Sequence, residues 1–153
     1  PEINQSYVPY VIETSIGADR LFLAVLCHAY REESVEGKER LYLSFNPAIA
    51  PVKAAIFPLV KKDGMPEKAQ ALFDDLKYDF SVVYEDAAAI GKRYVRQDLI
   101  GTPFCFTVDG QTLEDDTVTV RHRDSMMQER INISQVRTWL DERVSMKNLF
   151  RQL

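Results

Sequence analysis

Hydrophobic and polar positions indicate that the first 30 or so residues are built differently from the rest of the chain. Residues 7–13 are rich in β-branched and aromatic side chains, a pattern typical of a strand. Thr14 and Ser15 then offer hydroxyls that can cap a helix, and residues 17–31 continue as a helical pattern. Apolar positions run almost all the way round this segment, so we expect a helix that is buried in a larger structure.

A charged segment separates this part from the remainder. Residues 31–40 are dominated by charged side chains around Gly37, which predicts a solvated linker, and residues 41–50 show little periodicity. We therefore expect two units, residues 1–40 and residues 41–153.

From residue 51 onward, strand patterns alternate with helix patterns. Residues 52–60 are mostly apolar, as in a strand covered on both faces, and Asp109-Gly110 is a hairpin signal. Asp86 and Ser134 are expected to cap helices. The order predicts an α/β fold with a mixed, mainly parallel sheet of about five strands and helices on both faces, preceded by the strand and helix of the first unit. The expected elements are strands 52–60, 80–84, 102–108 and 117–123 and helices 67–76, 86–99 and 135–149.

Composition is that of an ordinary globular protein, with 46% hydrophobic and 27% charged residues. The longest apolar run, residues 21–27, is far shorter than the roughly 20 residues that cross a bilayer, so we expect no membrane association. Pro1 is not a natural start, which suggests a piece of something longer, and the absence of a leader pattern favours a cytoplasmic protein.

Cysteine usage points the same way. Cys27 and Cys105 lie far apart in apolar stretches, without a CxxC pair or a histidine cluster. We expect buried, reduced thiols and neither a zinc site nor a disulfide. For His28 and His122 a structural role is expected.

Residues 13–20 form the first candidate site. A strand delivers the carboxylate of Glu13, Ser15 follows, and Gly17 opens the helix that carries Arg20. Such a junction suits a small anionic or zwitterionic ligand, because the carboxylate can pair with an ammonium group and the arginine can reach a phosphate. Helix capping and a solvated Glu–Arg pair would explain the same residues.

Basic residues form the second candidate. The net charge of −4 and the pI of about 5.2 disfavour non-specific binding to nucleic acid, so any contact must come from a local patch. Helix spacing places Lys92 and Arg96 on one face, with Arg93 and Gln97 on an adjacent one. Alternation along strand 117–123 separates Val118, Val120 and His122 from a polar face of Thr117, Thr119, Arg121 and Arg123, which Arg130 extends. A solvated surface and a site for phosphates and bases both fit this pattern.

Two segments resemble known families. Residues 11–20, VIETSIGADR, resemble motif 3 of class II aminoacyl-tRNA synthetases in its glycyl version, with Thr14 where proline is common. Residues 90–104, IGKRYVRQDLIGTPF, and residues 112–124, TLEDDTVTVRHRD, are similar to the anticodon-binding domain of glycyl, threonyl, prolyl and histidyl synthetases, a likeness that covers roughly residues 51–144.

The resemblance implies roles for particular residues. Glu13 and Ser15 are expected to bind glycine, and Gly17 and Arg20 to bind ATP. Residues expected to bind the tRNA anticodon are Lys92, Arg93, Arg96, Gln97, Arg121, Arg123 and Arg130.

The implied parent is a homodimeric glycine–tRNA ligase whose partners are glycine, ATP with Mg²⁺ and glycine tRNA. Class II motifs 1 and 2 have no counterpart here, so we expect no complete catalytic set, no cofactor bound by this chain and no ligase activity from it alone. Two other interpretations remain, an accessory nucleic-acid-binding protein that uses the same domain and a purely structural or protein-interaction domain.

Overall fold

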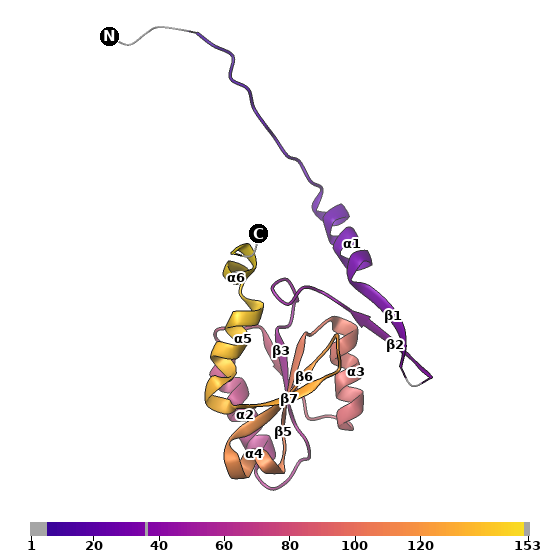
Figure 1. Ribbon diagram of the computed structural model, residues 1–153, viewed down its shortest axis with the longest axis vertical. Coiled ribbons are helices and arrows are strands. Elements are labelled where there is room, and N and C mark those ends of the chain that lie inside the picture. Colours follow the sequence, from indigo (N-terminus) through magenta and orange to yellow (C-terminus); the bar gives the residue numbers. More distant parts are fainter. Residues whose placement is uncertain (1–5, 36, 152–153) are drawn as a thin grey trace, which may run out of the picture.

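The computed structural model of the protein describes residues 6–35 and 37–151, which form an α/β domain with an N-terminal arm that projects away from it (Figure 1). In chain order the elements are α1 Ala18–Ala29, β1 Tyr30–Val35, β2 Lys38–Leu43, β3 Ala54–Pro58, α2 Met65–Leu76, β4 Val82–Tyr84, α3 Ile90–Ile100, β5 Phe104–Val108, α4 Gly110–Asp115, β6 Thr117–His122, β7 Gln128–Asn132, the 3₁₀ turn η1 Ile133–Gln135, α5 Val136–Val144 and α6 Met146–Phe150.

Five strands form the main sheet in the order β4-β3-β5-β6-β7. The first three strands run parallel to one another, and β6 is antiparallel to both of its neighbours. This confirms the predicted mixed sheet of five strands. The hairpin of β1 and β2 is a separate two-stranded sheet that contacts α3.

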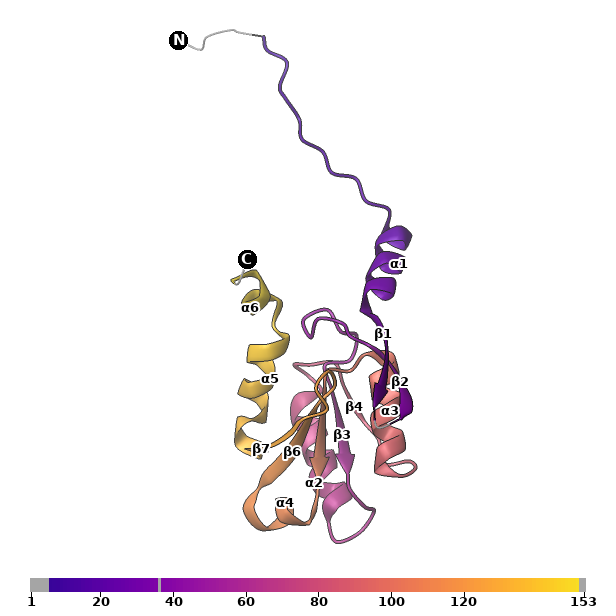
Figure 2. The same ribbon diagram turned by 45° about the vertical axis from the view of Figure 1, so that its right-hand side comes forward.

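Helices cover both faces of the sheet, as the pattern predicts. On one face, α2 and α5 pack over the inward side chains of β3, β5 and β6, and α3 covers the other face (Figures 1 and 2). Every residue of β3 and of β5 is buried, which explains why both strands are apolar almost throughout.

Strand β6 alternates between these two faces. Val118 and Val120 are fully buried in the α2/α5 core, and His122 packs its ring edge-on against Phe104 and Trp139. Arg121 points to the other face, towards α3. The predicted alternation is confirmed, and His122 has the structural placement expected of it.

Two predictions for the N-terminal part are wrong in this chain. Residues 7–13 form no strand within the described chain, because a strand needs a neighbour to accept its backbone hydrogen bonds and this segment pairs with none. Cys27 is exposed, whereas Cys105 is buried as expected, and both are free thiols. Helix α1 is present as predicted and is exposed here, with Phe22 69% exposed, so its burial in a larger structure stays a prediction.

The supposed linker is also ordered differently. Residues 30–35 and 38–43 pair as the β1–β2 hairpin, and the charged Arg40 has partners both within the hairpin, at Glu33, and on α3, at Asp98. The prediction of a solvated linker, which was based on charge alone, is therefore wrong.

Four local predictions fail after residue 85. Ala89 rather than Asp86 stands at the N-cap of α3. Asp109 caps the short helix α4 through a capping box with Thr112, so residues 109–110 are no hairpin turn. The last helix is divided at Ser145 into α5 and α6 and is preceded by η1, whose cap is Asn132 rather than the expected Ser134. Strand β7 was not predicted.

Leu140→Ala tests the packing of α5 on the sheet. Leu140 is fully buried, so we expect its truncation to lower the free energy of unfolding by about 2–5 kcal/mol, measured by urea denaturation. Leu113→Ala is the matched control, because that leucine is 41% exposed and should cost far less. Equal losses at both positions would contradict the assigned core.

Candidate functional site

The exposed side of α3 lines two hollows in the surface of the protein. Two adjoining hollows share Gly91 and Val95, one of about 350 Å³ and one of about 550 Å³. Lys92 and Arg96 line the smaller one. The larger one lies between α3, the hairpin and the end of β6, and its lining includes Lys38, Leu41, Tyr94, Leu99, Arg121 and Met126. We call the two together the α3 groove.

Apolar and cationic groups alternate in the α3 groove. Val95 is 55% exposed and Leu99 46%, so apolar surface is open to solvent between the basic side chains. Arg96 keeps about half of its side chain exposed while it pairs with Glu85 at 2.6 Å. A surface of this kind can pack flat, uncharged groups and hold an anionic chain beside them.

Arg93 and Gln97 lie on the buried side of the same helix. The Arg93 guanidinium donates to the carbonyls of Pro58 at 2.6 Å and Ala88 at 2.9 Å, while Gln97 accepts from the Thr102 hydroxyl at 2.7 Å. Both side chains are almost fully buried. The spacing correctly separated them from Lys92 and Arg96, but the expectation that they are open to a ligand is wrong, because they hold neighbouring backbone in place.

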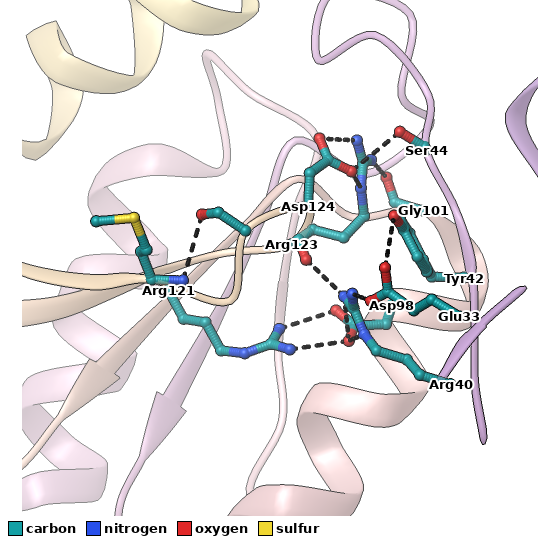
Figure 3. A network of polar contacts seen from close by, with 11 residues as sticks. Glu33, Arg40, Tyr42, Ser44, Asp98, Gly101, Arg121, Arg123 and Asp124 are labelled. Atoms are coloured by element: carbon teal, nitrogen blue, oxygen red, sulfur yellow. Dashed lines mark hydrogen bonds and ion pairs between the residues drawn. The ribbon is translucent and has the colours of Figure 1, made fainter. Parts of the chain in front are cut away.

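Arg121 is paired rather than free. Its two terminal nitrogens donate to the two carboxylate oxygens of Asp98 on α3, at 2.9 and 3.0 Å, and the residue is 7% exposed (Figure 3). The same carboxylate accepts from Arg40 of β2 at 3.0 and 3.2 Å. Burial lowers the pKa of the Arg40 guanidinium, but hydrogen bonds to Glu33 and Asp98 outweigh this effect and raise the pKa overall.

Arg123 is the most enclosed of the predicted binding residues, at 2% exposure. It donates to the carbonyl of Gly101 at 2.7 Å and pairs with Asp124 at 2.8 Å (Figure 3). It also donates to the carbonyl of Phe45 at 2.8 Å. Burial opposes ionisation of Asp124, yet its bonds to Arg123 and Ser44 leave the pKa of that carboxyl lowered. Arg123 therefore ties the loop after β2 to the end of α3.

Arg130 on β7 is exposed but also engaged. Its guanidinium donates to both carboxylate oxygens of Asp109, at 2.8 and 3.1 Å, and to the hydroxyls of Thr117 and Thr119. Hydrogen bonds from Arg130 lower the pKa of Asp109 to about 2. This cluster joins the start of α4 to strands β6 and β7 and adds a polar surface in which the Arg130 charge is paired with that of Asp109.

The continuous basic face predicted from the sequence therefore does not form. Lys92, Arg96 and Arg130 are exposed, and the other four predicted binding residues are buried. Sequence reasoning missed Asp98, whose carboxylate accepts hydrogen bonds from Arg121, and Arg40, which donates to the same carboxylate. No spacing rule joins residues 40, 98 and 121, so only the fold reveals that they meet.

The first candidate site is open in this structure. Glu13, Ser15 and Gly17 lie in the exposed arm and Arg20 lies in the first turn of α1, also exposed. Gly17 occupies the N-cap of α1 without a side-chain cap, so the expected capping by Thr14 or Ser15 is wrong. These residues lie near one another only because they are close in sequence.

Among the described residues, no group of three histidine, cysteine or carboxylate side chains could hold a metal ion. No described helix is both long enough and apolar enough to cross a bilayer.

Comparison with known proteins gives a consistent result. Residues 53–143 match the family model described as "Anticodon binding domain". The chain is 58% identical over 137 residues to a glycine–tRNA ligase of Chlorobaculum tepidum and 51% identical over 145 residues to one of Clostridium acetobutylicum. These alignments cover 90% and 94% of this chain, which spans 29% and 31% of the two ligases.

Solved structures show the same fold. A prolyl-tRNA synthetase from Cryptosporidium parvum aligns with a TM-score of 0.60 at 25% identity, over 71% of this chain and 24% of that protein. The RNA-binding domain of a threonyl-tRNA synthetase from the same organism aligns with a TM-score of 0.59 at 20% identity, over 65% of this chain and 25% of that one.

Gly101→Ala tests the packing of the loop after β2 against the end of α3. Gly101 has φ +82°, and an added Cβ would lie 2.4 Å from the Phe45 ring and 2.9 Å from the Leu43 carbonyl. Gly64 has the same φ with open space around it, so Gly64→Ala should cost only the backbone strain of about 1–2 kcal/mol. We expect Gly101→Ala to cost about 1–3 kcal/mol more in thermal or urea unfolding, through overpacking. Equal costs would mean that the Phe45 loop is not docked as described.

Arg130→Gln tests the Asp109 pair through acid stability. Because the folded-state pKa of Asp109 lies at about 2, below its ordinary value of 3.8, the pair stabilises the fold above pH 3.8 and loses this contribution as pH falls towards 2. Removing Arg130 should therefore shrink the loss of unfolding free energy between pH 4.5 and 2. Lys147→Gln on α6 removes one positive charge elsewhere and should keep the wild-type acid dependence.

Proposed function

Since the chain belongs to the anticodon-binding-domain family, we propose that it is the anticodon-binding region of a glycine–tRNA ligase, together with the end of that enzyme's catalytic domain. The observation that supports the RNA contact is the α3 groove, where exposed Lys92 and Arg96 stand beside exposed apolar surface. The identities to glycine–tRNA ligases support the choice of glycine tRNA.

The chemistry of an RNA loop fits the α3 groove. Loop bases are unstacked, so their faces can pack on Val95, Leu99 and the neighbouring Tyr94. Their phosphates can lie against Lys92 and Arg96. Arg130 and its threonine neighbours offer further donors and acceptors for base edges on β6 and β7.

We assign a different part to the buried basic residues. Arg93, Gln97, Arg121 and Arg123 give shape to the surface by holding α3, the hairpin and the adjoining loops, and they contribute little open charge. RNA contact by Arg121 is limited to the edge that lines the α3 groove.

The N-terminal arm is proposed to belong to the catalytic domain, with the boundary near the hairpin at residue 40. There Glu13 and Ser15 would bind glycine while Gly17 and Arg20 would bind ATP, which is accompanied by Mg²⁺, and the remaining groups would come from the preceding part of the enzyme. The exposed apolar side chains of residues 7–23 support this placement, because burying them against a larger domain is favourable. A homodimeric, cytoplasmic enzyme is part of the same proposal.

Binding of glycine tRNA by the isolated chain tests this proposal. We expect weak binding that Lys92→Ala combined with Arg96→Ala reduces several-fold, with the slope of log affinity against log salt falling by up to about 1.4 for two lost phosphate contacts. The control removes two exposed lysines from other elements, Lys77→Ala with Lys147→Ala, and should bind as the wild type does.

Competitors separate the proposal from its rivals. Preference for glycine tRNA over an unrelated tRNA and over duplex DNA supports it. Equal binding of all three favours an accessory nucleic-acid-binding protein, and no binding at all favours a structural or protein-interaction domain.

A further inference from the structure

Asp98 stands where three parts of the molecule meet. It lies on α3 with 4% of its side chain exposed, and one carboxylate accepts from Arg121 of β6 and from Arg40 of the hairpin (Figure 3). Arg40 also donates to the main-chain carbonyl of Arg123. Anionic Asp98 thus separates two guanidinium groups that would otherwise repel each other.

The hairpin meets the main domain through β2 and the loop that follows it. Its strands form their own sheet, and among the described residues its side-chain hydrogen bonds to the main domain are those of Arg40, with Ser44 donating to Asp124 at 3.0 Å just beyond β2. Arg40 moves as part of the hairpin, because it pairs with Glu33 and its guanidinium stacks 4.1 Å from the centre of the Tyr42 ring.

Helix α1 continues directly from the hairpin. It ends at Ala29 and β1 begins at Tyr30, with no intervening residue, and the Ser44 amide donates to the Ala29 carbonyl at 2.6 Å. A change in the angle of the hairpin is therefore expected to turn α1 as well, because no linker residue separates the helix from the strand and a backbone hydrogen bond joins the two. The docking of Arg40 on Asp98 consequently sets the direction of α1 relative to the α3 groove.

We propose that Asp98 is a positioning residue that holds the catalytic segment at a fixed orientation to the anticodon-binding surface. The names catalytic segment and anticodon-binding surface rest on the proposed function, whereas the fixed orientation of α1 rests on the geometry alone. Apolar packing holds the hairpin without fixing its angle, whereas two nitrogens of Arg40 donate to one oxygen of Asp98 and one of them also donates to the Arg123 carbonyl. Because the guanidinium is planar, these contacts also define a direction, which suits a joint between two units.

A distance measurement between two spin labels tests the orientation in this chain. Cys27 is exposed in the last turn of α1 and takes one label, and Thr138→Cys on α5 takes the other. Cys105 stays unlabelled because it is 1% exposed and burial raises the pKa of its thiol. Pulsed electron paramagnetic resonance then gives the distribution of distances between the two labels. The proposal requires this distribution to have a single narrow peak.

Two variants release the joint in different ways. Asp98→Asn removes the shared charge, and Arg40→Gln removes only the hairpin side while the Arg121 pair to Asp98 stays, so the second variant remains informative if the first fails to fold. Both are expected to broaden the distribution roughly twofold or more. Asp63→Asn makes the same chemical change in an exposed turn and should leave it narrow.

A second label pair separates a loose joint from a loosened domain. Lys92→Cys on α3 and Thr138→Cys on α5, in a Cys27→Ser background, lie on opposite faces of the sheet and report on the domain itself. We expect this distance to stay unchanged in Arg40→Gln. Broadening of this distance as well would mean that Asp98 serves general stability, which would overturn the proposal. A broad wild-type peak for the first label pair, or a peak for that pair that stays unaltered in both variants, would also overturn it.

The full-length ligase supplies the functional readout. Arg40→Gln should lower kcat for charging of whole glycine tRNA several-fold, while the tRNA-independent exchange of pyrophosphate into ATP stays near wild type. Arg40 also lines the α3 groove, so kcat and not KM is the readout that decides. A change in KM alone would count against positioning. If the wild-type chain binds no tRNA, the proposed function fails, yet the label distances still decide whether Asp98 holds the joint.

Discussion

The buried carboxylate of Asp98 is the constraint on which the arrangement of this molecule depends. Burying two guanidinium groups within 3.2 Å of one carboxylate costs desolvation free energy, which their mutual hydrogen bonds and charges must offset. Breaking such a buried group on one side costs about 3–5 kcal/mol, because the charge left behind has no partner. One side chain thereby links the sheet, α3 and the hairpin, in addition to the apolar packing between α3 and the sheet.

This constraint explains how an acidic domain uses its arginines. Arg93, Arg121 and Arg123 cap carbonyls or pair with carboxylates, and every buried side-chain polar atom among the described residues has a hydrogen-bond partner. Of the predicted binding residues, Lys92 and Arg96 keep their charge open on α3, beside apolar surface, and Arg130 lies exposed on β7. Recognition of an RNA loop on this surface would depend on shape and stacking as much as on charge.

The elements of the sheet and its two helical layers could be predicted because each segment carries its own period. Strands β3 and β5 are apolar on both faces, and the alternation in β6 separates Val118 and Val120 from Arg121. The extended arm at residues 7–13 could not be predicted, because an apolar strand pattern does not show whether its partner surface lies within the same chain. The hairpin was hidden by its charged residues, which pair across space and not along the sequence.

Sequence by itself determined the α/β class, the order of the main elements, the likeness to an anticodon-binding domain and which side of α3 carries Lys92 and Arg96. Those features depend on local periodicity and on short motifs, which the chain displays without folding. Tertiary structure alone decided which arginines are open and which are enclosed. Residues 40, 98 and 121 come from three separate elements, and only the packing of those elements brings one carboxylate within reach of two guanidinium groups.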